Sequence, residues 1–133
     1  MNKDIMNISK IETYLNDIID NVVSRNTFFT VLPDPSIVKA SDWQDMVLIN
    51  IPEGIKDFEA YGQGHIFVGL YAKPLESGRK NVKKMSELEI KLNEVIDNAS
   101  HENYVISRDD VMSTYDDDVN WHCNVVTLII KIY

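Results

Sequence analysis

The sequence predicts an α+β protein in which two helices pack against a predominantly antiparallel sheet of about five strands. Two segments carry apolar residues at helical spacing, and five others show strand-like alternation or short apolar runs bounded by proline, glycine or aspartate. Their order along the chain is helix, three strands, helix, two strands. The chain has 133 residues and no internal repeat or linker, so residues 1–133 are expected to form a single domain.

The first helix is predicted from an apolar stripe that runs from Ile11 to Val23 at steps of three and four residues. Ser9 and Glu12 fit an S-x-x-E capping box at its start. Such a stripe could bind a partner, but a helix that covers a sheet is the more common explanation. Residues 1–8 are expected either to extend this helix or to form an N-terminal arm.

Three strands are expected next. Residues 27–32 and 45–51 are short apolar runs, each followed by proline, which cannot continue a strand ladder. Residues 36–44 connect them. Residues 52–63 are expected to form a loop. Residues 64–73 then alternate along the third strand, with Ile66, Val68, Leu70 and Ala72 on one face.

The second helix is predicted to follow a polar loop at residues 75–84. Its apolar stripe at helical spacing consists of Met85, Leu88, Leu92, Val95 and Ile96. The fourth strand is expected over residues 104–115, with a bulge at Asp109 and Asp110, and an acidic turn leads into the last strand. Residues 121–133 are apolar on both faces in their middle part, which is typical of a central strand with neighbours on both edges.

The composition indicates an acidic globular protein. Thirteen Lys and Arg residues against 21 Asp and Glu residues give a formal net charge of −8. This balance argues against a protein that grips the nucleic-acid backbone, but it suits a channel through which DNA passes without specific binding. Cys123 is the only cysteine, so no internal disulfide is expected and a reducing compartment fits. We also expect no signal peptide and no membrane association.

The residue pattern offers no catalytic centre. His65, His101 and His122 lack Cys or His neighbours at zinc-ligand spacing. Cys123 follows His122 on a strand, where adjacent side chains point to opposite faces, so we do not expect these two residues to form a nucleophile pair. The aspartates near the predicted hairpin match no EF-hand loop, and no phosphate-binding glycine motif is present. The sequence therefore favours a protein that is not an enzyme and that has no metal site and no cofactor.

A basic group precedes the second helix and an acidic turn precedes the last strand. The basic group consists of Arg79, Lys80, Lys83 and Lys84, and the acidic turn of Asp116, Asp117 and Asp118. Cations at a helix start oppose the helix dipole, so they are either solvated or meet negative charge from elsewhere. We hypothesise that they meet the acidic turn of an adjacent copy, in a head-to-tail contact that can close a ring. Reversing the charge of Lys83 and Lys84 is then expected to weaken self-assembly.

Phe58 and Tyr61 lie in the predicted loop at residues 52–63. Apolar residues in a loop can tuck under the protein's own core or reach a neighbouring subunit. We keep both alternatives and include Phe58 and Tyr61 among the candidate interface residues.

The order of elements resembles that of the tail terminator and neck ring proteins of tailed bacteriophages. The shared layout is an N-terminal amphipathic helix, two strands around a proline-rich connector, a strand of the type HIFVGLYAK (residues 65–73), a polar loop, a helix and a long C-terminal hairpin. The resemblance implies a homo-oligomeric ring without catalytic residues that joins head and tail and leaves a lumen for DNA. Its implied partners are further copies and other neck, portal or tail-tube proteins, in the virion and, during assembly, in the host cytoplasm. Its implied interfaces are the loops 52–63 and 73–84.

Two other functions stay open. The net charge of −8 and the lack of catalytic groups also suit a small acidic binding module, such as a nucleic-acid mimic that inhibits a nucleic-acid enzyme. A mimic would act as a monomer or dimer, whereas a connector needs a closed ring or a partner ring. An unrecognised enzyme would need a pocket with converging polar groups.

Overall fold

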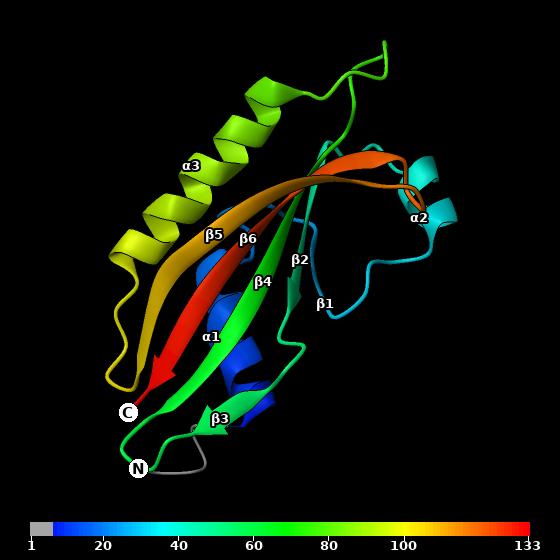
Figure 1. The fold of residues 1–133 in the computed structure, drawn as a ribbon. Coiled ribbons are helices and arrows are strands. Elements are labelled where there is room, and N and C mark those ends of the chain that lie inside the picture. Colours follow the sequence, from blue (N-terminus) through cyan, green and yellow to red (C-terminus); the bar gives the residue numbers. More distant parts are fainter. Residues whose placement is uncertain (1–6) are drawn as a thin grey trace.

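A strongly twisted sheet forms the centre of the computed structural model, which describes residues 7–133 (Figure 1). In chain order the elements are α1 (Ile8–Ile19), β1 (Thr27–Phe29), α2 (Pro35–Ala40), β2 (Asp45–Asn50), β3 (Ile55–Asp57), β4 (Gly62–Ala72), α3 (Val82–Asn98), β5 (Tyr104–Asp116) and β6 (Trp121–Ile132). The six strands of the described residues are ordered β1-β2-β4-β6-β5, and β3 pairs with β4 outside this path. β1 and β2 run parallel, and the other pairs are antiparallel. The predicted α+β class is confirmed.

Two elements were not expected from the sequence. Residues 55–57, predicted as loop, form β3, which pairs with the first residues of β4. The close approach depends on Gly64, where a Cβ atom would lie 2.5 Å from Ile55 Cδ1. The short helix α2 begins at Pro35, and the Asp34 carboxylate accepts the backbone N–H of Ser36 at 2.9 Å. The strand predicted over residues 27–32 ends at Phe29, before Thr30 with its positive φ, so proline does not end it. Pro35 instead starts a helix.

The start of α1 differs from the prediction. Asn7 caps the helix, because its side-chain oxygen accepts the backbone N–H of Ser9 at 2.9 Å. The predicted capping box of Ser9 and Glu12 is therefore wrong, since Ser9 already lies inside the helix. The helix ends at Ile19, so Val22 and Val23, predicted to belong to its stripe, lie beyond it; Val23 is buried in the main core, whereas Val22 is exposed. Residues 1–6 of the predicted N-terminal arm lie outside the described residues.

The main core lies between the sheet and the two long helices. α1 contributes Ile11, Leu15 and Ile19, and α3 contributes Met85, Leu88, Leu92 and Ile96. They pack against alternate residues of β2, β4 and β6, among them Ile66, Val68, Leu70 and Ala72, which were predicted to share one face of β4. β6 lies between β4 and β5, which confirms its predicted central position.

The other face of the sheet is covered only at one end. There α2 and the segment before β2 enclose a second, smaller core around Met46, Tyr71, Trp121 and Cys123. Farther along the same face, Phe67, Thr127 and Ile129 are only half-buried. The sheet therefore has one fully covered face and one partly open face.

Candidate assembly surfaces

The outer edge of β5 is the longest uncovered edge of the sheet. β5 spans 13 residues and pairs with β6 on one side, and no strand of the described chain pairs with its other side. The predicted bulge is confirmed by a register shift between Arg108 and Asp110. The large apolar side chains that are exposed on this strand are Val105, Val111, Met112 and Tyr115. Bulges and charges protect natural edge strands, but exposed apolar side chains beside them are typical of a contact surface.

The predicted basic group does not form one outward-facing patch, because Lys80 is bound inside the molecule. Its ammonium donates to Asn124 Oδ1 at 2.7 Å and to Ser113 Oγ at 3.0 Å. The amide of Asn124, a buried residue of β6, donates in turn to Glu89 of α3. Lys80 therefore helps to satisfy a buried polar group and links the loop before α3 to the hairpin.

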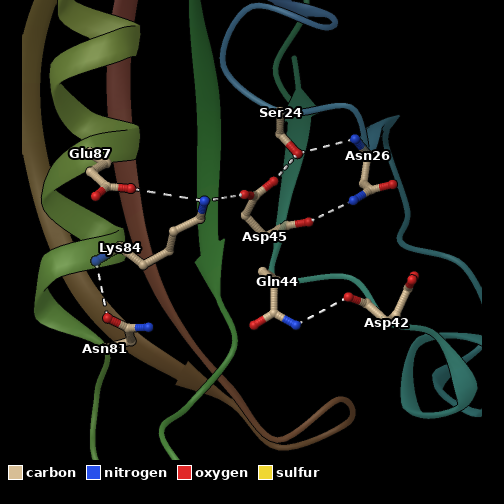
Figure 2. A network of polar contacts seen from close by, with 8 residues as sticks. All are labelled: Ser24, Asn26, Asp42, Gln44, Asp45, Asn81, Lys84 and Glu87. Atoms are coloured by element: carbon tan, nitrogen blue, oxygen red, sulfur yellow. Dashed lines mark hydrogen bonds and ion pairs between the residues drawn. The ribbon is translucent and has the colours of Figure 1, made fainter.

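Lys84 is also held within the molecule (Figure 2). Its ammonium lies 2.9 Å from Asp45 Oδ2 and 3.9 Å from Glu87 Oε2. Asp45 also accepts the hydroxyl of Ser24, and its backbone carbonyl accepts the Asn26 amide at 3.0 Å. This network joins the first turn of α3 to the start of β2 and to the segment after α1. Lys84 therefore stabilises the fold, whatever it does at an interface.

Replacing Lys84 with methionine is expected to lower the free energy of unfolding by about 1–2 kcal/mol. The ion pair is partly screened, since the two side chains are 25% and 17% exposed, but its loss leaves Asp45 with less compensation. Lys83→Met is the matched control, because Lys83 is exposed and forms no ion pair or side-chain hydrogen bond with the described residues. Urea unfolding of both variants measures the difference, and equal stabilities would contradict a structural role for Lys84.

The acidic turn is only partly free. Asp116 Oδ2 accepts the Tyr71 hydroxyl at 3.0 Å, and Asp116 Oδ1 accepts the backbone N–H of Asp118 at 3.0 Å. Asp117 and Asp118 are exposed, and the end of the β5–β6 hairpin lies beside α2 (Figure 1). Val119 is buried there with Val38 of α2. The turn is thus fixed against its own molecule.

Phe58 and Tyr61 lie at the end of the sheet away from the acidic turn. The rings of Phe58 and Tyr61 are stacked, with centroids 5.3 Å apart, and the ring centroids of Tyr61 and Tyr133 are 6.1 Å apart. The ammonium of Lys131 lies 5.6 Å from the Tyr61 ring. Tyr61 is thus partly tucked against its own strand ends, whereas Phe58 is exposed. The predicted interface residues therefore lie at both ends of the sheet rather than on one surface.

His65 lies on β4, His122 and Cys123 lie on β6, and His101 lies between α3 and β5. His101 packs between Tyr14 and Tyr104, with ring centroids at 4.9 and 4.4 Å. Within residues 7–133 no three His, Cys, Asp or Glu side chains are grouped to hold a metal ion. Cys123 is buried beside Tyr71, and this burial raises the pKa of the thiol to about 11. Such a thiol is unreactive at neutral pH.

A hollow of about 690 Å³ opens between the segment after α1, the start of β2 and α3. The residues around it are Asn21, Val22, Val23, Ser24, Arg25, Asn26, Asp42, Trp43, Gln44, Asp45, Lys84 and Lys91. Residue spacing does not group Arg25 with Lys91, because Arg25 lies between α1 and β1 and Lys91 lies in α3. The hollow is the second surface feature, besides the edge of β5, that could take part in assembly.

No protein-family model and no curated protein matches this sequence. No helix within residues 7–133 is long and apolar enough to cross a membrane. A functional proposal for this protein therefore depends on its fold, its charge and its two surface features.

Proposed function

We propose that this protein is a structural virion component of a tailed phage. In this proposal, copies of the chain form a closed ring in the neck or tail of the virion, as in tail terminators and head–tail connectors. Each copy contacts the next through two different surfaces. The ring connects the phage head to the phage tail, and its partners are portal, tail-tube or other neck proteins. Apart from the short elements α2 and β3, the order of elements is the one on which the family resemblance rests, and this supports the proposal.

The outer edge of β5 is the single observation that carries the proposal. It presents unpaired backbone groups over a strand of 13 residues, next to exposed apolar side chains such as Val111 and Met112. An edge of this length without a cover invites contact with another chain. In a ring protein that contact is made by the next copy.

The charge of β5 favours a head-to-tail contact over a two-fold contact. A two-fold axis at the bulge would bring Asp109 and Asp110 of one copy against the same residues of the other, and facing like charges are unfavourable. A heterologous contact instead joins this edge to a different surface of the next copy, and such contacts generate rings when the rotation closes. The net charge of −8 suits a ring whose lumen lets DNA pass without holding it.

A small acidic binding module is the second candidate, and one observation favours it. Five aspartates gather on β5 and on the turn that follows, namely Asp109, Asp110, Asp116, Asp117 and Asp118. A row of carboxylates along a strand can imitate the phosphates of nucleic acid toward a basic enzyme groove. Such a module would act as a monomer or dimer, so the state of assembly separates the two candidates.

Replacing Met112 with lysine is expected to abolish self-assembly, because an ammonium on the β5 edge is costly to bury in a contact between copies. The measurement is the mass in solution by light scattering, at low and high protein concentration. Ile37→Lys on α2 is the matched control, since Ile37 is 53% exposed and Met112 is 61% exposed. A wild-type oligomer that falls to the 15.3 kDa monomer only in Met112→Lys supports the proposal.

A wild-type protein that stays monomeric at every concentration and salt would contradict the ring. The acidic binding module would then be favoured, and capture of a basic nucleic-acid enzyme would be the next measurement. An oligomer that Met112→Lys and Ile37→Lys leave equally intact would show that the ring contact lies away from β5.

A further inference from the structure

We propose that the hollow lined by Arg25, Lys84 and Lys91 is the receptor for the bulged part of β5 from the neighbouring copy. The inference rests on the proposed ring and identifies the two surfaces that meet in it. It replaces the contact between the basic group before α3 and the acidic turn, because Lys80, Lys84 and Asp116 are bound within their own molecule.

The hollow carries cations that its own molecule does not neutralise. Lys84 is offset by Asp45 at 2.9 Å, whereas Arg25 and Lys91 are exposed and form no ion pair with the described residues. Asp42 is the remaining carboxylate of the lining. The lining thus has three cations and two carboxylates, and Glu87 beside it offsets Lys84 further, so Arg25 and Lys91 are the cations available to a partner. The hollow is an attractive place for acidic side chains on an otherwise negative molecule.

The bulge on β5 has the chemistry of the occupant. Asp109 and Asp110 are adjacent exposed carboxylates without an ion-pair partner in the described chain, and the bulge directs side chains out of the regular alternation. Val111 follows directly and is 59% exposed. Val22, which lines the hollow, is 52% exposed and provides an apolar counterpart. Carboxylates and an apolar side chain therefore meet cations and an apolar side chain.

Part of the hollow and the bulge belong to opposite edges of the sheet. Arg25 precedes β1, which is one end of the strand order, and β5 is the other end. Lys84 and Lys91 lie on α3, which reaches β5 through the ion pair of Asp97 with Arg108 at 2.8 Å. The acidic turn is a poorer occupant, because the hairpin end lies beside α2 of its own molecule (Figure 1). α2 ends at Ala40, two residues before Asp42 of the hollow, so the turn and the hollow belong to neighbouring parts of one copy. A head-to-tail contact needs two distinct patches that face away from each other.

The test uses two double variants that reverse the charge of one surface each. Arg25→Glu with Lys91→Glu reverses the hollow, and Asp109→Lys with Asp110→Lys reverses the bulge. Each is expected to weaken self-association by more than about tenfold in apparent Kd, because like charges then face each other across the contact. Circular dichroism and thermal unfolding check that each variant folds. If the lysine variant of the bulge does not fold, Asp109→Asn with Asp110→Asn replaces it.

Mixing the two variants provides the decisive measurement. Each one repels its own copies, but the reversed bulge fits the reversed hollow, and the native bulge fits the native hollow. An equal mixture is therefore expected to regain the wild-type mass by light scattering, with the two chains alternating in the ring. High salt should weaken wild-type assembly, since exposed charges are screened.

Two control variants separate the possible outcomes. Lys10→Glu with Lys39→Glu changes the net charge equally away from the hollow, and Asp117→Lys with Asp118→Lys reverses the acidic turn; both are expected to assemble. If the turn variant fails to assemble and the bulge variant assembles, the occupant is wrong. If hollow and bulge variants both assemble while Met112→Lys does not, the inference is overturned and the proposed ring stands. If the wild-type protein never assembles, the proposed ring itself is overturned, and the inference with it.

Discussion

Replacing Ile130 with alanine is expected to lower the free energy of unfolding by about 2–5 kcal/mol. Ile130 is fully buried on β6, on the face that α1 and α3 cover, between Gly64 of β4 and Ile106 of β5. Removing its side chain leaves a cavity in the main core, and the strands on both sides of β6 limit how far the backbone can relax to fill it. Urea unfolding measures the loss, and an unchanged slope shows that the two-state transition is retained.

Ile129 is the control, because it is the same residue type one position earlier on the same strand. It points to the partly open face and is only half-buried, so Ile129→Ala is expected to cost less than about 1.5 kcal/mol. The comparison removes effects of strand propensity, which the two substitutions share. Equal losses would mean that both faces of β6 are packed alike, contrary to the fold.

The fold class followed from periodicity, and the reason lies in a few elements. β6 is apolar on both faces because it has strands on both sides, helices below it and the smaller core above its first residues. α3 buries Met85, Leu88 and Leu92 at helical spacing. Periodicity of this kind reports burial directly, so long elements that face a core are visible in a sequence.

The short elements β3 and α2 could not be predicted from apolar periodicity. β3 has three residues, and its pairing with β4 depends on Gly64 rather than on its own alternation. α2 has six residues and depends on Asp34 as its cap and Pro35 at its first turn. In both, a local backbone feature or a tertiary neighbour decides the structure, and no apolar period is long enough to indicate it.

The candidate interface was predicted only in part, because a sequence does not show whether a charged side chain pairs within its own molecule or stays available to a partner. The bulge was predicted at Asp109 and Asp110, where the structure has a register shift. By contrast, Lys80 and Lys84 form ion pairs or hydrogen bonds within their own molecule, which neighbouring letters do not indicate. Arg25 and Lys91 line one hollow only because the chain folds α3 beside the segment after α1.

Raising the pH from about 8 to about 11 is expected to remove about 2–3 kcal/mol of stability through Cys123. Burial raises the pKa of this thiol from 9.0 to about 11, so the fold favours its protonated form. The unfolded chain ionises first as the pH rises through 9. The stabilisation is therefore complete below pH 9 and is lost as the pH approaches 11, at about 1.4 kcal/mol per unit. Burial also raises the pKa of the Tyr71 hydroxyl, which adds to the loss in the same direction.

Cys123→Ala separates the thiol from the lysines and tyrosines that titrate in the same range. Urea unfolding of wild type and variant across this pH window gives two curves, and only their difference reports on Cys123. The variant is less stable at neutral pH because a small cavity opens beside Tyr71, but its stability should fall less steeply between pH 9 and 11. Parallel curves would mean that the thiol ionises equally in both states. In that event solvent would reach Cys123, and a thiol reagent should modify it in the folded protein without global unfolding.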